Sequence, residues 1–335
     1  SLWVTCPSMR CVISLGDGTL SIGERPSPRP GPGEVRVRVH AAGLNRADLL
    51  QRAGFYPAPP GVPADIPGLE FAGEVVELGE GVVSPAIGTR VFGIAAGGAQ
   101  AEEIVVASTH CAVVPESLDL VSAGGVPEVF LTAHDALRTQ ALLLPGERVL
   151  VHAVGSGVGT AVLQLARAWG CETTGTARTP EKLSRAQALG LDNAILAPSE
   201  IDPLSFAAQI TEAAGGPIDV TADLVGGAYV TADVLASAAG GRIVLIGTLA
   251  GGRCELPILA VMSKRLRLFG TVLRPRTRDE KSAATAAFVA EVVPLLASGA
   301  VAPVIETVLP LSDAEQGYEL LASDTTFGKV ILDCR

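Results

Sequence analysis

A short apolar run followed at once by a glycine-rich turn is the feature that most constrains this sequence. Residues 148–153 (RVLVHA) have the continuous apolar character of a buried parallel strand. The turn after them leads into a predicted helix over residues 158–169. Such a turn lets the backbone approach a pyrophosphate, and the helix N-terminus offers free N–H groups and a positive dipole end. The pattern predicts a dinucleotide site contacted by Gly155, Ser156, Gly157, Val158 and Gly159.

The turn departs from the usual glycine spacing. In the G-x-G-x-x-G register, Val154 and Ser156 stand where the first two glycines are expected. In an A-x-x-G-x-x-G register, Ala153 and Gly159 match, but Ser156 again takes the middle place. We expect the two glycines on either side of Ser156 to supply the missing flexibility. The departure therefore weakens the assignment of individual contacts and not that of the site.

Strands and helices alternate along the sequence on both sides of this turn. The predicted strands are 148–153, 171–176, 193–197, 218–224, 242–247 and 266–273, and the predicted helices are 129–140, 158–169, 180–189, 203–214 and 228–238. Alternation of this kind favours a parallel, doubly wound sheet. The fold class is therefore α/β over this part of the chain.

The first 126 residues have a different character. Val35, Val37 and Val39 alternate with polar residues, which is the period of a half-buried strand. Further strands are predicted over 9–15, 20–22, 71–78 and 88–94, a short helix over 45–52, and an irregular loop over 55–67. The last 60 residues are predicted to hold a helix over 282–298 and strands over 302–308 and 328–333. These end segments predict a mostly β domain.

The end of the second predicted strand of the doubly wound part bears on the choice of cofactor. NAD sites usually carry an Asp or Glu there, which bonds the ribose 2′-hydroxyl. The segment Thr174–Thr179 has none, whereas Arg178 lies at the strand end and Lys182 one helical turn beyond. Two cations without a carboxylate favour a 2′-phosphate and hence NADPH. The alternative is that both are solvated surface charges.

Composition narrows the partners and the location. The formal net charge is −10, so most of the surface repels nucleic acid. No apolar run reaches the roughly 18–20 residues that span a membrane. The first residues lack the pattern of a signal peptide. Residues 1–8 are either a native part of the domain or an extension, and the sequence favours neither. We expect a cytoplasmic protein that acts on a small molecule.

The six cysteines show no metal-binding spacing. They are Cys6, Cys11, Cys111, Cys171, Cys254 and Cys334. No two form a C-x-x-C pair, and the one nearby histidine, His110, is adjacent to Cys111, where the two are poorly placed to hold one metal. We expect reduced thiols packed as small hydrophobes.

Several segments in family order resemble the quinone oxidoreductases of the medium-chain dehydrogenase/reductase superfamily. The similarity is greatest to the p53-inducible quinone oxidoreductase subgroup. The segments that carry it are Asn45–Leu49, Gln51–Tyr56, Pro127–Ala133, the glycine-rich turn, Thr271–Arg274 and Gly328–Val330. They span nearly the whole chain, so the resemblance identifies the family and not the substrate.

The resemblance implies an architecture of two domains. A GroES-like catalytic domain is built from both chain ends, residues 1–126 and 274–335, and a Rossmann domain, residues 127–273, is inserted between them. The resemblance also implies a homodimer, often formed through the last Rossmann strand, here residues 266–273.

The resemblance also implies that the chain works without zinc. Zinc-dependent members hold the metal with a Cys and a His-Glu pair, and the corresponding positions here are Asn45 and Leu69-Glu70. Asn and Leu replace neither thiolate nor imidazole. The cysteine-rich loop of a structural zinc is absent from the sequence as well.

Two residues match family positions that face the nicotinamide and the substrate. A Tyr56 hydroxyl is able to hydrogen-bond an acceptor carbonyl as its oxygen gains charge. Asn45 is the second expected catalytic residue. The alternatives are that Tyr56 is a loop aromatic capping the core and that Asn45 caps the helix at 46–52.

Further cofactor contacts are expected from Thr132, Gly247, Thr271 and Leu273. Asp48 and Glu70 have the character of structural residues. His134 is expected to be a packed or solvated helix residue. Arg274, Arg276 and Arg278 are expected to lie on a solvated loop.

Three functions remain open. The first is NADPH-dependent reduction of a quinone by hydride transfer without a metal, in which the cofactor carries the chemistry and the protein aligns the acceptor. The second is reduction of an enoyl thioester, since a conjugated enone is electronically close to a quinone. The third is an NADPH-binding redox sensor with low turnover.

Overall fold

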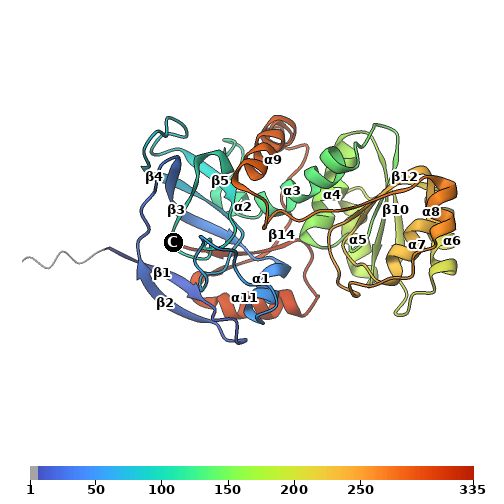
Figure 1. The fold of residues 1–335 in the computed structure, drawn as a ribbon, viewed down its shortest axis with the longest axis horizontal. Helices are drawn as coiled ribbons and strands as arrows, with labels where there is room; N and C mark the ends of the chain where they lie inside the picture. The colour runs from blue at the N-terminus through green and yellow to red at the C-terminus, as the bar shows by residue number, and fades with distance from the viewer. Residues whose placement is uncertain (1–6) are drawn as a thin grey trace, which may run out of the picture. The chain divides into compact units, whose positions relative to one another are not determined.

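The computed structural model describes residues 7–335, and its chain divides into two compact units. One unit comprises the residues up to Leu131 together with Leu273–Arg335, and the other comprises Thr132–Val272. The second unit is thus an insertion in the first (Figure 1). The expected extension over residues 1–8 falls largely outside the described residues.

The inserted unit is built on a six-stranded parallel sheet. Its strands lie in the order β10-β9-β8-β11-β12-β13 (Figure 1). Their bounds are β8 Arg148–Val151, β9 Glu172–Ala177, β10 Asn193–Leu196, β11 Ile218–Asp223, β12 Ser237–Leu245 and β13 Arg267–Gly270. This is the strand order of a doubly wound dinucleotide-binding sheet, which confirms the predicted α/β fold.

Helices alternate with these strands, and the sequence caps several of them. The helices are α4 Gly157–Ala168, α5 Pro180–Ala188, α6 Pro203–Ala213, α7 Ala228–Ala236 and α8 Ile258–Lys264. The side chains of Ser156, Thr179 and Asp202 accept hydrogen bonds from N–H groups in the first turns of α4, α5 and α6. Proline at the start of α5 and α6 fixes a helical φ where no N–H partner is needed.

The unit formed by the chain ends is mostly β. Strands β14-β15-β3-β4-β5-β7 form one sheet, β6 pairs with β3, and β1 and β2 form an antiparallel ribbon. The bounds are β1 Ser8–Ile13, β2 Ser21–Pro26, β3 Glu34–Gly43, β4 Glu70–Leu78, β5 Arg90–Ile94, β6 Glu103–Ala107, β7 Cys111–Val113, β14 Ile305–Pro310 and β15 Lys329–Asp333. The late strand β15 pairs with the early strand β3, so both chain ends share one sheet.

Helices also belong to this unit. They are α1 Arg46–Arg52, α2 Leu120–Ala123, α9 Arg278–Glu291, α10 Val293–Ala297 and α11 Ala314–Ala322. The helix α3 Pro127–His134 runs across the boundary between the units and continues as a π-helical segment over Asp135–Gln140. No helix in the described part of the chain is long and apolar enough to cross a membrane.

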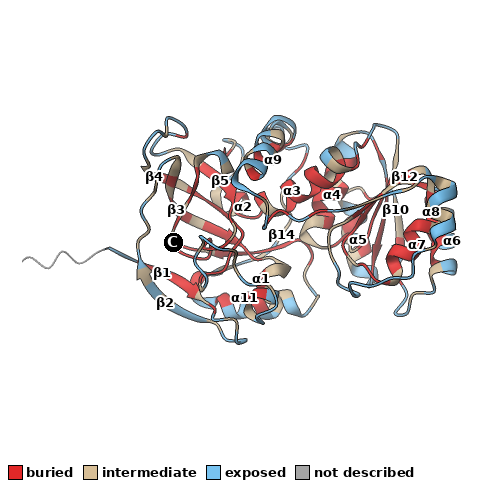
Figure 2. Ribbon diagram, viewed as in Figure 1, coloured by how far each residue is buried: buried red, intermediate tan, exposed pale blue. Residues whose placement is uncertain are grey.

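The core of this unit follows the predicted alternation. Val35, Val37 and Val39 are buried together with Phe71 and Tyr318. Figure 2 shows the buried residues running along β3 and β5. The apolar face of β3 therefore positions the loop and helix that follow it, which begin at Leu44.

Several elements differ from the predictions. The helix predicted over 282–298 is interrupted at Val292, because Pro294 lacks the N–H that would continue α9. The predicted strand 266–273 is only four residues long, Arg267–Gly270. The helices α2, α8 and α11 and the strands β6 and β7 were not predicted. Short elements such as α2 and β7 carry too few residues for a periodic pattern.

Candidate active site

The turn between β8 and α4 is shaped by its serine and by an alanine. Ser156 has an extended backbone and caps α4, its hydroxyl accepting a hydrogen bond from the Gly159 N–H at 3.0 Å. The left-handed residue of the turn is Ala153, with φ 51°. Neither of the glycines beside Ser156, Gly155 and Gly157, has a positive φ. The serine in the middle place instead orients the first turn of the helix.

Gly159 allows the helix to pack closely on the turn. A Cβ atom there would lie 2.4 Å from the carbonyl oxygen of Ala153 and 2.8 Å from Cα of Val154. Real Cβ contacts are not this short, so only glycine fits. This is the part that the third glycine plays in dinucleotide-binding turns. The turn and the start of α4 thus have the form of a pyrophosphate site.

The carboxyl ends of β8 and β11 flank the point where the strand order reverses. Ligands of doubly wound sheets bind at such a point. Asp223 is the last residue of β11, and its carboxylate accepts hydrogen bonds from the Val225 and Gly226 N–H groups at 2.7 and 3.0 Å. Gly247 lies in the next loop, and a Cβ there would meet the carbonyl oxygen of Leu224 at 2.5 Å. The backbone is closely packed around the predicted cofactor contact Gly247.

The end of β9 carries the two predicted phosphate-binding cations. Arg178 directly follows the strand and is exposed, and Lys182 lies in the first turn of α5. Thr179 between them caps α5 and accepts a hydrogen bond from the Lys182 N–H at 3.4 Å. The Arg178 charge also reaches the buried Tyr229, whose pKa is raised by burial and lowered in part by that charge. Both cations therefore follow the carboxyl end of β9, the strand that pairs with β8.

Three other predicted cofactor contacts are largely buried. Thr132 lies on α3, and Thr271 and Leu273 follow β13. The Thr271 hydroxyl donates to the Asp135 carboxylate at 2.5 Å, and its N–H donates to the Leu245 carbonyl. His134, also on α3, is buried and contacts the Trp169 ring edge to face, with ring centroids 6.1 Å apart.

A buried lysine organises the polar residues of the unit formed by the chain ends. Lys329 is 4% exposed, and its ammonium donates to the Leu44 carbonyl at 2.6 Å. It also lies 2.7 Å from Asn45 Oδ1 and 2.7 Å from Glu70 Oε1. The Asn45 amide group in turn donates to Glu70 Oε1 at 2.9 Å. Lysine, asparagine and glutamate therefore form one closed network.

Two further carboxyl groups adjoin this network. Asp48 is buried in α1 and accepts a hydrogen bond from the Asn45 N–H at 2.8 Å, while burial raises its pKa to about 6. Glu128 lies at the start of α3, where its N–H donates to Glu70 Oε2 at 2.9 Å. Burial, together with the nearby Glu70 charge, raises the pKa of Glu128 to about 8. Glu128 lies in Pro127–Ala133, one of the segments that carry the family resemblance, but the sequence predicted no role for it.

Tyr56 is held by an arginine expected to be solvated. Arg274 is 5% exposed, and its guanidinium donates to the carbonyls of Ala96 and Tyr56 at 2.8 and 3.0 Å and to Gln51 Oε1 at 2.5 Å. It also lies over the Tyr56 ring, 4.7 Å from its centroid. The expectation of a solvated Arg274 is wrong, whereas Arg278 is exposed. Burial raises the pKa of the Tyr56 hydroxyl, and the Arg274 charge opposes this rise.

The side chains at the family's zinc positions do not fit a zinc ion. Leu69 is 2% exposed and has no ligand atom. Both oxygens of Glu70 already accept hydrogen bonds, and the Lys329 ammonium lies between the oxygens of Glu70 and Asn45. A metal ion would have to displace that ammonium and would meet no thiolate or imidazole. Among residues 7–335, no three His, Cys, Asp or Glu side chains are grouped to hold a metal.

The cysteines that the structure describes are free thiols. Cys11, Cys171 and Cys334 are buried, Cys111 is part-buried and Cys254 is exposed. Burial raises the pKa of the Cys111 thiol to about 12. Cys6 lies outside the described residues.

Two family models match the chain. Residues 31–137 match the alcohol dehydrogenase GroES-like domain, and residues 157–291 match the zinc-binding dehydrogenase model. Although the second model is named for zinc binding, this chain has Asn45 and Leu69 at the positions where zinc-dependent members have metal ligands.

Known proteins of two kinds are similar to the chain. A quinone oxidoreductase of Sus scrofa is 32% identical over 301 residues, which cover 89% of this chain and 88% of that protein. A pikromycin polyketide synthase component of Streptomyces venezuelae is 41% identical over 214 residues, which cover 64% of this chain. That match spans only 6% of the synthase component's own length.

A solved structure, that of the CurK enoyl reductase, has a TM-score of 0.82 at 25% identity and covers 97% of this chain and 99% of its own. The near full-length match to a quinone oxidoreductase and the paired domain models agree with the GroES-like and Rossmann units described above. The chain therefore belongs to the medium-chain dehydrogenase/reductase superfamily of nicotinamide-dependent oxidoreductases.

Proposed function

We propose that the chain reduces a quinone with NADPH by hydride transfer that needs no metal. The observation that carries this proposal is the Lys329 ammonium, which lies 2.7 Å from both Asn45 Oδ1 and Glu70 Oε1. It takes the place that a catalytic cation would need. Activation of the acceptor then falls to hydrogen-bonding side chains, which suits a quinone that accepts a hydride readily.

Apart from Leu273, the residues expected to contact the cofactor lie in the inserted unit. The turn Gly155–Gly159 would hold the pyrophosphate, and Arg178 and Lys182 the 2′-phosphate. Thr132, Gly247, Thr271 and Leu273 would line the nicotinamide end. The bound nicotinamide supplies the hydride, and the protein's part is to orient it and to exclude water.

Tyr56 would hydrogen-bond the acceptor oxygen as it gains charge. Arg274 donates a hydrogen bond to the Tyr56 carbonyl and stacks on the Tyr56 ring. These two contacts would hold the Tyr56 hydroxyl in a defined position. The Asn45 amide donates to Glu70 and to the Gly43 carbonyl, and its oxygen accepts from Lys329. Asn45 would therefore shape the site wall beside the acceptor.

A coupled assay tests the proposal. The purified chain is mixed with NADPH or NADH and a panel of benzoquinones and naphthoquinones, and cofactor oxidation is followed by absorbance. We expect turnover with quinones, a preference for NADPH, and full activity after dialysis against a strong chelator. Loss of activity on chelation, restored by zinc, would contradict the metal-free reaction. Binding of NADPH with no turnover would favour the redox-sensor alternative.

Reduction of an enoyl thioester is the second candidate, favoured by the similarity to a polyketide synthase component and to an enoyl reductase structure. An enone and a quinone both accept a hydride on carbon and leave charge on oxygen. Adding a short enoyl thioester to the same panel separates the two. A specificity constant for the thioester well above that for every quinone would assign the chain to enoyl reduction.

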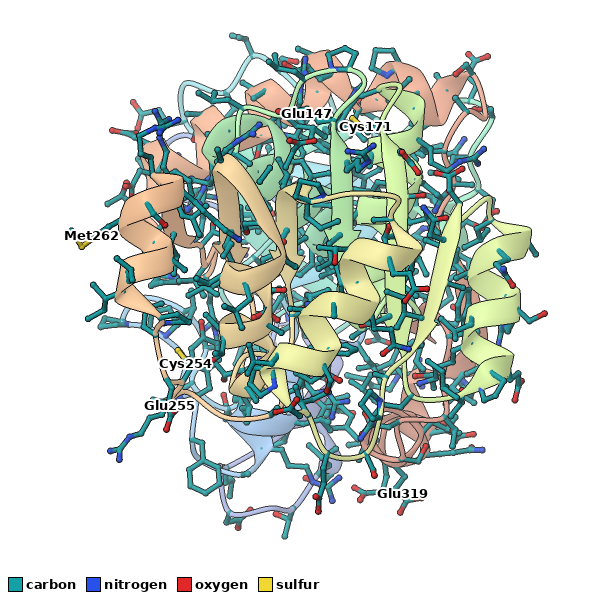
Figure 3. The ribbon with its side chains drawn as sticks, turned by 90° about the vertical axis from the view of Figure 1, so that its right-hand side faces the viewer. Glu147, Cys171, Cys254, Glu255, Met262 and Glu319 are labelled. Carbon is teal, nitrogen blue, oxygen red and sulfur yellow. The ribbon has the colours of Figure 1, made fainter. Side chains whose placement is uncertain are left out.

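We also propose a homodimer formed through the open edge of the Rossmann sheet. Strand β13 ends the sheet, so one of its sides has no strand partner within the described chain. Leu259 and Met262 on α8 are 79% and 68% exposed, and Met262 points outward in Figure 3. Exposed apolar residues beside a free strand edge suit an isologous interface. Sedimentation should give a dimer that Leu259→Glu with Met262→Glu converts to monomer.

A further inference from the structure

Glu128 differs from every other acidic residue near the candidate active site. It is the second residue of α3, and its N–H is bonded to one Glu70 oxygen while Lys329 and Asn45 contact the other. Its own carboxyl is part-accessible, and no hydrogen bond to it is found among residues 7–335. The group is therefore near the network without being consumed by it.

The charges around Glu128 favour its neutral form. The nearby acids are Glu70, Asp48 and Glu128 itself, and the nearby cations are Lys329, Arg274 and Lys281. Each ammonium hydrogen of Lys329 is already committed, to Leu44, Asn45 and Glu70. Arg274 directs its guanidinium at Ala96, Tyr56 and Gln51. The Lys281 ammonium donates to the carbonyls of Arg274 and Arg276. None of the three cations is hydrogen-bonded to Glu128, and a partly buried carboxyl without such a partner favours its neutral form.

Glu128 is better placed than Asp48 to release that proton. Asp48 is buried on α1 and bonded to the Asn45 backbone, whereas Glu128 keeps an accessible surface. Glu128 is also close enough to Tyr56 for its charge to affect that hydroxyl. The accessible acid and the tyrosine therefore border the same part of this unit.

We propose that Glu128 is a catalytic acid that donates a proton to the acceptor after hydride transfer, a role that rests on the function proposed above. The acceptor gains two electrons and one hydrogen as hydride. The O–H bond of the Glu128 carboxyl then breaks, a new O–H bond forms on the reduced quinone, or a C–H bond on a reduced enone, and the carboxylate regains its proton from water. The proton from Glu128 would thereby neutralise the negative charge that a metal cation stabilises in a metal-dependent site.

The groups that act on Glu128 come from several elements. They are Glu70 of β4, Asp48 of α1, Lys329 of β15, Arg274 before α9, Lys281 of α9 and Tyr56 after α1. The two carboxylates raise its pKa and the cations lower it, with burial the largest cause of the rise to about 8. Below that pH the acid is protonated and competent, and above it the proton is lost.

The protonation state is tested first, without any assay of activity. Carbon-13 spectra of the chain labelled at glutamate side-chain carboxyls are recorded across pH in the wild type, Glu128→Gln and Glu319→Gln. We expect one resonance that titrates near pH 8, absent from Glu128→Gln and retained in Glu319→Gln, since Glu319 is exposed on α11 (Figure 3). Titration of the Glu128 resonance below pH 6 would overturn the proposal, whatever the chain's activity.

The catalytic role is tested by the pH profile of kcat with saturating NADPH. In the wild type kcat should fall as pH rises through about 8. Glu128→Gln should lower kcat about 100-fold at pH 7 and remove that limb, because an amide keeps the size but has no acidic proton. Glu128→Asp should keep the limb, and Glu319→Gln should match the wild type. A Glu128→Gln profile that retains the wild-type limb and rate would overturn the role.

The two arms also separate this inference from the proposed function. If neither quinone nor thioester is reduced by the wild type, the proposed function fails while the spectra still report the state of Glu128. If turnover is normal but the glutamate titrates near its ordinary value, the proposed function stands and the acid role fails. Melting curves of each variant show whether it is folded.

Discussion

The candidate site residues fall into two halves, one in each unit, and the two halves are built by opposite means. In the Rossmann unit, the cofactor turn is made by neighbours in sequence: Ser156 caps the helix that starts one residue later, and Gly159 packs on Ala153. In the GroES-like unit, Asn45, Glu70 and Lys329 come from three distant segments and are joined by side-chain contacts. The first half depends on backbone geometry, and the second depends on contacts between charged and polar side chains.

This difference teaches where each half is vulnerable. A backbone site tolerates most side-chain changes except at its cap and its glycine, because main-chain N–H groups do the binding. A buried charge network tolerates almost none, because removing one member leaves another charge unpaired. Substitutions in the two units should therefore separate into effects on cofactor binding and effects on stability.

The largest expected effect is that of Lys329→Met. It removes the ammonium from the buried carboxylate of Glu70 and should destabilise the chain by about 3–5 kcal/mol. Urea unfolding measures this. The double variant Lys329→Met with Glu70→Gln removes both charges and should recover part of the loss. Equal stability of the wild type and Lys329→Met would show that the network is not electrostatic in origin.

The paired variant Arg178→Ala with Lys182→Ala should act on cofactor choice alone. Each charge-assisted phosphate contact contributes roughly 1.5–3 kcal/mol before solvent screening. Calorimetric titration should show NADPH binding weakened at least tenfold and NADH binding nearly unchanged. Arg185→Ala, on the same helix, serves as the control. Equal weakening of both cofactors would remove the 2′-phosphate assignment.

Tyr56→Phe deletes one hydroxyl and leaves the ring over which Arg274 lies. If that hydroxyl steadies developing charge, kcat/KM should fall by roughly one to two orders of magnitude, or about 1.4–2.8 kcal/mol. NADPH affinity and the melting temperature should change little. A smaller loss is expected with a quinone than with an enoyl thioester. Unaltered kinetics with all acceptors would leave Tyr56 as a wall of the pocket.

Ser156→Ala gives the smallest effect and sharpens the contrast between the units. Loss of this helix cap should cost about 1 kcal/mol of stability. NADPH and NADH binding should weaken alike, because both carry the pyrophosphate. The Asp202→Ala cap variant on α6 should lose similar stability with no change in cofactor affinity. A cofactor-selective effect of Ser156→Ala would place the serine away from the pyrophosphate.

The same contrast explains what the sequence allowed us to predict. The strand, turn and helix around residues 148–169 were predicted because their signals are local, and the sheet order confirms the fold class. Burial of Arg274 was not predicted, because its partners Gln51, Tyr56 and Ala96 lie more than 170 residues away. Nothing local distinguishes a buried arginine beside a proline from a solvated one.

Glu128 and α8 were missed for related reasons. A glutamate at the start of a helix reads as an ordinary partner of the helix dipole, and its proximity to Glu70 depends on the packing of α3 against β4. The helix α8 has apolar residues that face outward, so it lacks the polar and apolar faces of a surface helix.

The pairing of β15 with β3 sets an order on biosynthesis. A ribosome releases residues in sequence, so the Rossmann unit emerges complete while the sheet of the GroES-like unit still lacks its late strands β14 and β15. Until β15 arrives, Glu70 and Asn45 have no ammonium beside them. A nascent or truncated chain can thus contain a complete Rossmann unit and an incomplete GroES-like unit. The contacts of Lys329 therefore form only after strand β15 has been translated.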